Sequence, residues 1–120
     1  MPCKNNWNPN AAIRLQNLLG ICRKAGKLEL GAEPSVRALT AGRLYGVLVC
    51  LDTSEKSRKE ARFHCARAGV PCLDIPLTKQ DVGRCAGRGA GVLGVSDEGF
   101  FRRMAELSAA DAWKSGAVTT

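Results

Sequence analysis

Gly46-Val47-Leu48-Val49-Cys50-Leu51 is a continuous apolar run of strand length near the middle of a 120-residue chain. An uninterrupted run, rather than an alternating one, is typical of a strand that helices cover on both faces. Residues 52–54 can cap a helix, and a charged helical segment then continues to Ala68 before a glycine and a proline. The centre of the sequence therefore predicts a sheet between two layers of helices.

The alternation of helix and strand continues in both directions from this run. Towards the N-terminus we predict a helix over 9–25, a strand over 27–30 and a second helix that has Pro34 in its first turn and runs to Ala41. Towards the C-terminus we predict a strand over 72–75, a helix that Thr78-x-x-Asp81 opens, a strand over 92–95 and a helix capped by Asp97. This order predicts an α/β fold, a three-layer α/β/α sandwich with a mixed four-stranded sheet. We expect a single domain over 1–107 and a flexible C-terminal tail over 108–120.

The composition narrows the class of protein and of partner. Lysine and arginine number 18 against 11 acidic residues, which gives a net charge of +7 and favours a polyanionic partner. No apolar run is long enough to span a membrane, and the N-terminal residues lack the apolar stretch of a signal peptide. The six cysteines are widely and irregularly spaced, without a Cys-x-x-Cys pair. They predict reduced thiols in a cytoplasmic protein rather than a disulfide framework or a structural zinc site.

Three features suggest catalysis, and each has a simpler explanation. The glycine-rich stretch Gly87–Gly91 follows a helix and precedes a strand, the reverse of a dinucleotide-binding fingerprint, so we expect a close approach between backbones there. His64 and Cys65 are adjacent in a helix, and their side chains therefore diverge. Asp52 ends the central strand, where enzymes often place acids, but it can equally cap the next helix. We expect no enzymatic activity, no cofactor and no metal.

The basic residues form two groups in the sequence. Arg23, Lys24 and Lys27 lie where the first helix meets the first strand, and Arg84 and Arg88 flank the glycine-rich stretch. Arg37 lies one turn into the second helix, four residues after Glu33. Glycine-bearing loops next to helix N-termini let cations and backbone N–H groups reach phosphates together. This arrangement favours nucleic-acid binding over a merely solvated face.

An ordered series of short motifs resembles a known family. The chain is similar to the kink-turn-binding ribosomal protein family, which includes archaeal large-subunit protein seven-Ae, its eukaryotic relatives and the bacterial YlxQ-type proteins. The resemblance covers about residues 12 to 107 and is closest to the bacterial branch. Its motifs are Leu18-Leu19-Gly20, Arg23-Lys24-Ala25-Gly26-Lys27, Leu30-Gly31, Val47-Leu48-Val49 with Asp52 and Ser54, Val70-Pro71, Asp81-Val82-Gly83-Arg84, Gly87, Val95-Ser96-Asp97 and Gly99-Phe100.

The resemblance implies a non-enzymatic protein that binds RNA kinks with tandem sheared G·A pairs. Members use the N-terminus of the second helix and the loop before the last strand. Together with the basic residues, these regions give the predicted RNA-binding set Lys24, Lys27, Gly31, Ala32, Glu33, Arg37, Arg84, Gly87, Arg88, Gly89 and Ala90.

The second helix departs from the family pattern at its start. The best-characterised members carry Gly-x-Asn-Glu there, with a basic residue three positions after the Glu. This chain keeps Gly31 and Arg37, but it has Glu33 in place of the Asn and Pro34 in place of the Glu. An ionised Glu only accepts hydrogen bonds, whereas Asn also donates. General RNA binding is therefore less affected by the departure than kink-turn specificity is.

We expect the partner to be a structured RNA, ribosomal or containing a kink-turn. No membrane partner and no DNA specificity are expected, and the protein is expected to be a monomer. The alternative hypothesis is a protein-interaction module on the same fold, and the third hypothesis is a small enzyme.

Overall fold

The computed structural model describes residues 9–114 of the 120-residue chain. Five helices and four strands alternate along these residues. They are α1 (Pro9–Lys24), β1 (Leu28–Leu30), α2 (Ala32–Thr40), β2 (Gly46–Val49), α3 (Glu55–Ala68), β3 (Cys72–Asp74), α4 (Lys79–Ala86), β4 (Val92–Val95) and α5 (Glu98–Lys114).

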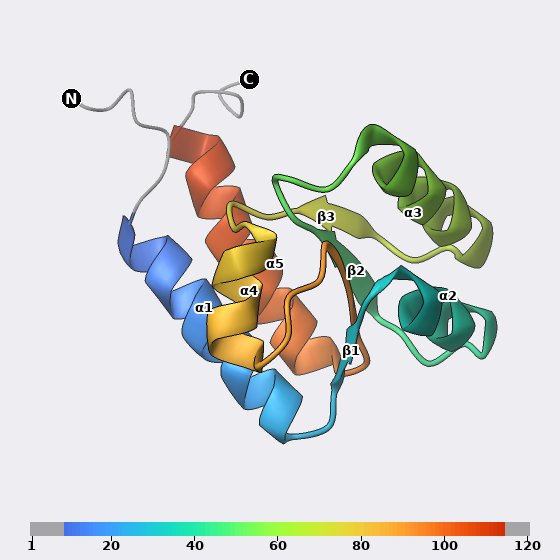
Figure 1. Ribbon diagram of the computed structural model, residues 1–120, viewed down its shortest axis with the longest axis horizontal. Coiled ribbons are helices and arrows are strands. Elements are labelled where there is room, and N and C mark those ends of the chain that lie inside the picture. The colour runs from blue at the N-terminus through green and yellow to red at the C-terminus, as the bar shows by residue number, and fades with distance from the viewer. Residues whose placement is uncertain (1–8, 115–120) are drawn as a thin grey trace.

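The strands form one mixed sheet in the order β1-β4-β2-β3. β2 and β3 are parallel, whereas β4 is antiparallel to both of its neighbours, β1 and β2. Helices α2 and α3 lie on one side of the sheet, and α1, α4 and α5 lie on the other (Figure 1). The predicted α/β/α sandwich with a mixed four-stranded sheet is therefore confirmed.

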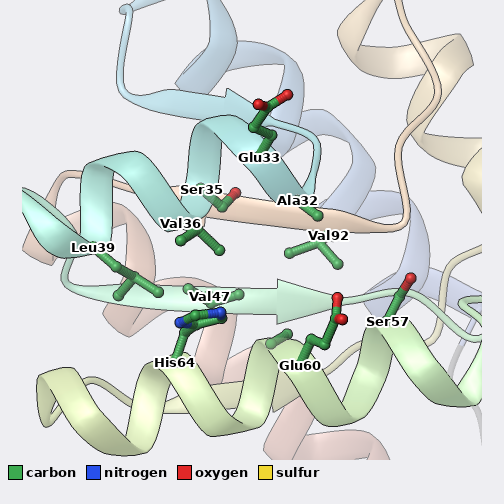
Figure 2. Close-up of a pocket in the computed structure, with 11 residues that line it drawn as sticks. Ala32, Glu33, Ser35, Val36, Leu39, Val47, Ser57, Glu60, His64 and Val92 are labelled. Carbon is green, nitrogen blue, oxygen red and sulfur yellow. The ribbon is translucent and has the colours of Figure 1, made fainter.

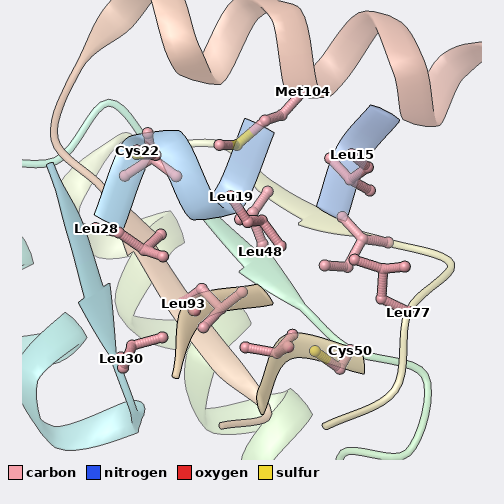
Figure 3. Packing of buried hydrophobic residues seen from close by; sticks show 14 residues of the cluster. Leu15, Leu19, Cys22, Leu28, Leu30, Leu48, Cys50, Leu77, Leu93 and Met104 are labelled. Atoms are coloured by element: carbon pink, nitrogen blue, oxygen red, sulfur yellow. The ribbon is translucent and has the colours of Figure 1, made fainter. Parts of the chain in front are cut away.

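The apolar run of β2, together with Cys50 directly after it, supplies both halves of the core. Leu48 and Cys50 pack with Leu19, Leu93 and residues of α1, α4 and α5 (Figure 3). Val47 and Val49 point to the other face and pack with residues of α2 and α3. All four residues of β2 are buried, which explains why apolar residues occur without alternation in this strand.

Capping side chains fix the N-termini of α3, α4 and α5 where the sequence predicts them. Ser54 caps α3 by accepting a hydrogen bond from the Ser57 N–H. Thr78 and Asp81 form the predicted capping box of α4, and Asp97 accepts from the Phe100 N–H at 2.9 Å. These polar side chains satisfy amide groups that the first turn of a helix leaves unpaired.

The sequence expectation holds at the start of α2 and differs at the end of α5. α2 begins at Ala32 and has Pro34 in its first turn, where a helix does not need the N–H that proline lacks. α5 continues to Lys114, so the domain boundary expected at 107 falls within the helix. Ser108 is still buried, which shows that packing continues past that point. Residues 115–120 of the expected tail lie outside the described part, as does Asn8.

The thiols give a direct test of the redox state. The five cysteines within the described residues are free, and burial raises the pKa of the Cys22 and Cys50 thiols to about 12. Only the thiolate reacts readily. A thiol count on unfolded protein, prepared without reductant, should therefore find all six cysteines. Folded protein at pH 8 should leave Cys22 and Cys50 unreacted. A count of two or fewer in the unfolded protein would contradict the prediction of reduced thiols.

Candidate functional site

Two of the predicted segments meet at one end of the sheet, where β1 and β2 end and β4 begins. The Gly31 N–H, directly after β1, donates to the Val92 carbonyl at 2.8 Å. The Arg88 guanidinium reaches across from the loop after α4 and donates to the Leu30 carbonyl at 3.0 Å. The start of α2 and the loop 87–91 thus form one surface, although they are more than fifty residues apart in the chain.

The first turn of α2, which follows Gly31, exposes backbone donors on this surface. Gly31 has φ 110°, a conformation that favours glycine, and a Cβ there would lie 3.3 Å from the Pro34 ring. No side chain caps α2, and Ala32 and Glu33 are exposed. Their N–H groups belong to the first turn, which has no intrahelical acceptor for them, and they lie at the positive end of the helix dipole. They are available to an anion or a base edge.

The loop 87–91 is held by contacts between its backbone and the rest of the protein. A Cβ on Gly89 would lie 3.0 Å from the Lys79 carbonyl oxygen, and one on Gly91 would lie 2.6 Å from the Thr53 hydroxyl oxygen. The Thr53 hydroxyl donates to the Gly91 carbonyl at 2.9 Å, and the Cys50 thiol donates to the Ala90 carbonyl at 3.4 Å. Glycine is required here for close approach, as the sequence predicts, and the loop has a fixed shape.

The charged residues at this surface differ in how firmly other side chains of the protein hold them. Arg37 and Glu33 form a loose pair, with 3.7 Å between Nη1 and Oε2 and with exposed side-chain fractions of 66% and 85%. Such an exposed pair is worth little and opens easily. Arg84 is bound to Asp81 within α4. The pKa of Asp81 is lowered mainly by the hydrogen bond from the Thr78 N–H, so Asp81 stays ionised and holds Arg84.

Lys24 and Lys27 do not join the other predicted residues. The Lys27 carbonyl accepts from the Ser96 N–H, beyond the last residue of β4, whereas Gly31 bonds to Val92 at the beginning of β4. The two lysines are exposed and precede β1, at the end of this strand away from Gly31. Figure 1 shows this end of β1, where the chain arrives from α1. The structure therefore separates them from the start of α2.

The structure adds Lys79 to the surface and changes the role of Asp52. The Lys79 N–H donates to the Asp52 carboxylate at 3.0 Å, so Asp52 caps α4 rather than α3, where Ser54 does so. The expectation that Asp52 caps the helix after its own strand is wrong, because the end of β2 lies beside the start of α4. The Lys79 Cε lies 3.0 Å from the Cβ position of Gly91. The ammonium group of Lys79 therefore lies beside the loop, and it forms no ion pair with any described residue.

A groove between α2 and α3 begins beside the same helix start (Figure 2). Its volume is about 310 Å³. Apolar side chains, among them Val36, Leu39 and Val92, line most of it, with Glu60 and His64 on the α3 side. The buried Ser35 hydroxyl also faces this region and has no hydrogen-bond partner among the described residues.

The described residues contain neither a metal-binding cluster nor a membrane span. No group of three His, Cys, Asp or Glu side chains within residues 9–114 could hold a metal ion. None of the helices in this range is both long and apolar enough to cross a membrane. The chemistry at the surface is that of hydrogen-bond donors and cations on a fixed backbone.

The sequence model of the ribosomal protein L7Ae/L30e/S12e/Gadd45 family matches residues 14–104, which begin within α1, end within α5 and include every element between them. The chain belongs to this family. This family is non-enzymatic, and the two relatives described next are named as an RNA-binding protein and a ribosomal protein.

Relatives of the chain within the L7Ae family span bacteria and archaea. The RNA-binding protein YlxQ of Enterococcus faecium is 28% identical over 94 residues, which are 78% of this chain and 90% of YlxQ. The large ribosomal subunit protein eL30 of Aeropyrum pernix is 29% identical over 89 residues, 72% of this chain and 89% of eL30. The resemblance to YlxQ-type proteins is therefore confirmed.

Two solved structures have the same L7Ae-type fold. A protein of unknown function from Bacillus halodurans has a TM-score of 0.74 and 29% identity, over 79% of this chain and 96% of its own. The 15.5kD RNA binding protein of Giardia lamblia has a TM-score of 0.69 and 18% identity, over 95% of this chain and 98% of its own. At that identity the likeness concerns the fold.

Proposed function

We propose that this protein binds structured RNA, and that it recognises a kinked RNA with tandem sheared G·A pairs. The proposal rests on one observation, that the uncapped start of α2 lies against the loop 87–91. Arg88 of this loop joins the two segments by donating a hydrogen bond to the Leu30 carbonyl. The family and its RNA-binding relatives support the same function. The surface acts by binding alone.

The groups at this junction match what a kinked RNA presents. The N–H groups of Ala32 and Glu33, Arg37 and Lys79 can neutralise phosphates that a sharp bend brings together. Guanidinium groups such as that of Arg37 can also form two parallel hydrogen bonds with a guanine edge. The Glu33 carboxylate can only accept, so it suits a base edge that carries N–H donors and disfavours a phosphate. We infer from this mixture that base edges, as well as the backbone, are read.

One chain supplies all of these groups, so the proposal needs no second copy, and we propose a cytoplasmic monomer. We propose RNA rather than DNA as the ligand. Sheared G·A pairs in a kink form where a single strand folds back on itself, and such folded strands are typical of RNA.

The test is a titration with two RNAs that differ only in the G·A pairs. One is a kink-turn hairpin, and in the other the sheared G·A pairs are replaced by Watson–Crick pairs. We expect tighter binding to the first and a steep fall of its affinity with salt, because phosphate contacts release counterions. Equal affinities would exclude kink recognition, and no binding to either RNA would exclude RNA as the ligand.

A second candidate function is a protein-interaction module. The apolar groove between α2 and α3 favours it, since such a groove can take side chains of a protein partner. This function predicts an association that changes little with salt. The salt titration therefore separates the two candidates.

Substitution of Glu33 by Asn tests the departure from the family pattern. Asn restores a donor at the start of α2 and removes a negative charge that faces the RNA, while Pro34 still holds the first turn. We expect tighter binding to the kink-turn RNA and little change for a plain duplex, as measured by fluorescence anisotropy. Weaker binding would mean that the Glu33 carboxylate itself accepts a hydrogen bond from a base. The control is Glu98→Gln, because Glu98 is also an exposed acid in the first turn of a helix, α5, with 66% of its side chain exposed against 85% for Glu33.

A further inference from the structure

The outer face of α3 carries an exposed aromatic ring in a line of cations. Lys56, Lys59, Phe63 and Arg67 are all exposed, and their spacing of three or four residues puts them on one side of the helix. The Phe63 side chain is 56% exposed. We call these four residues the α3 stripe. Neither core cluster contains any of them, so the packing of the protein does not explain Phe63.

The Phe63 ring is held by two neighbours and remains accessible. The Arg67 guanidinium carbon lies 5.7 Å from the ring centroid, within the range of a cation–π contact. The His64 ring packs edge-on at a centroid distance of 5.4 Å and an angle of 73°. These two side chains limit the rotation of Phe63, while more than half of the residue remains exposed.

The cations of the α3 stripe have no acidic partner within residues 9–114, unlike their neighbours on the same helix. Arg58 and Arg62 both bind Asp74, at 2.8 and 2.9 Å. Lys56, Lys59 and Arg67 are in no such ion pair. Of the two acids on α3, Glu55 lies in its first turn and Glu60 lines the groove towards α2. The α3 stripe is therefore net positive and open.

The α3 stripe begins next to the candidate site. Thr53, which holds Gly91 of the loop 87–91, comes directly before Ser54, the N-cap of α3. Lys56 lies in the first turn, and the stripe continues from there for eleven residues, or about 16 Å along the helix axis. A strand that leaves an RNA bound at the loop can follow this face of α3 without a gap.

We propose that the α3 stripe binds a single-stranded RNA segment that extends from the kinked RNA, with one base stacked on Phe63. Lys56, Lys59 and Arg67 contact its phosphates. An exposed aromatic side chain among cations is how proteins hold unpaired nucleotides, because every base has a face that stacks. A protein partner fits less well, since one exposed phenyl ring offers far less apolar area than a stable protein interface buries. The proposed path of the RNA depends on the proposed function, whereas the stacking on Phe63 does not.

The experiment compares two RNAs and three variants. The first RNA is the kink-turn hairpin with blunt arms, and the second carries a ten-nucleotide single-stranded extension in either direction. Phe63→Leu removes the ring but keeps an apolar side chain, Phe63→Tyr keeps the ring, and Tyr45→Leu is the control. Tyr45 is also exposed, but it precedes β2, at the end of the strand away from α3's first turn. Thermal unfolding checks that the variants fold.

Phe63→Leu should weaken binding of the extended RNA about tenfold and leave the blunt RNA unchanged. Phe63→Tyr and Tyr45→Leu should bind both RNAs as the original protein does. Lys56→Gln and Lys59→Gln should each reduce the salt slope for the extended RNA by about 0.7. If Phe63→Leu has no effect on the extended RNA, or an equal effect on the blunt RNA, the proposal is overturned.

A single-stranded oligonucleotide alone separates this proposal from the proposed function. If Phe63→Leu loses binding of this oligonucleotide, the proposal for the α3 stripe is supported. Equal binding of the kinked RNA and its Watson–Crick control would overturn only the proposed function and would leave that support intact. Polyglutamate serves as the probe for an acidic protein. Binding of polyglutamate with the same dependence on Phe63 would overturn the proposal in favour of such a partner.

Discussion

Substitution of Leu93 by alanine should lower the free energy of unfolding by about 2–5 kcal/mol, the range for a buried leucine whose cavity cannot collapse. Leu93 lies in β4, one of the two central strands, and is paired with Leu30 on one side and Leu48 on the other. Its side chain is fully buried among residues of α1, α4 and β1. Elements on three sides are fixed by other contacts, so little can move in to fill the space. Urea unfolding measures the change.

Leu51→Ala is the matched control, because the same atoms are removed from a side chain that is 46% exposed. We expect a loss below about 0.5 kcal/mol there. Losses of similar size at both positions would contradict the assignment of Leu93 to the core. Leu93 follows Val92, whose carbonyl accepts the hydrogen bond from Gly31 at the candidate site. The Leu93→Ala variant should therefore bind RNA more weakly at temperatures close to the unfolding temperature of the variant, and normally at temperatures far below it.

Substitution of Arg37 by alanine should weaken binding of the kink-turn RNA by about 1–3 kcal/mol, or roughly 5- to 150-fold, if its guanidinium reads a guanine edge. Contact with phosphate alone predicts a smaller loss that is similar for all RNA sequences. The loose pair with Glu33 does not hold Arg37 back, since an ion pair this exposed contributes at most about 1 kcal/mol. Anisotropy titrations at two salt concentrations distinguish base from phosphate contact.

Arg43→Ala controls for the loss of a positive charge from the same region of the chain. Arg43 is an exposed arginine that follows the C-terminal end of α2, away from the loop 87–91. We expect it to change affinity by less than threefold. Unchanged affinity in Arg37→Ala would remove Arg37 from the binding surface, and equal losses in both variants would reduce its role to general charge.

The elements of this fold are predictable because their signals are local. The run Gly46–Leu51 needs only its own side chains to indicate a strand covered on both faces, and Thr78 and Asp81 form a capping box within one helical turn. The glycine-rich stretch Gly87–Gly91 can likewise be interpreted from its place after a helix and before a strand. Such signals depend on spacing along the chain, which the sequence contains in full.

The arrangement of the candidate site depends on contacts between distant residues, which spacing does not reveal. The hydrogen bond from Lys79 to Asp52 joins residues 27 positions apart, so neither the role of Asp52 nor the presence of Lys79 at the loop could be predicted. Lys24 and Lys27 look like part of the site in the sequence, because they are close to Gly31 along the chain. The antiparallel register of β1 and β4 places them at the other end of the strand.

The fixed shape of the loop 87–91 decides which partner must change conformation during binding. Thr53 and Cys50 hold this loop in the free protein, so little of its conformational entropy remains to be lost when RNA arrives. Under the proposed function, the cost of bending is then borne by the RNA, and we expect the protein to select molecules that are already kinked. The apparent dissociation constant therefore varies inversely with the kinked fraction of the RNA. A cation or a sequence change that doubles a small kinked fraction should double the apparent affinity without altering any contact with the protein.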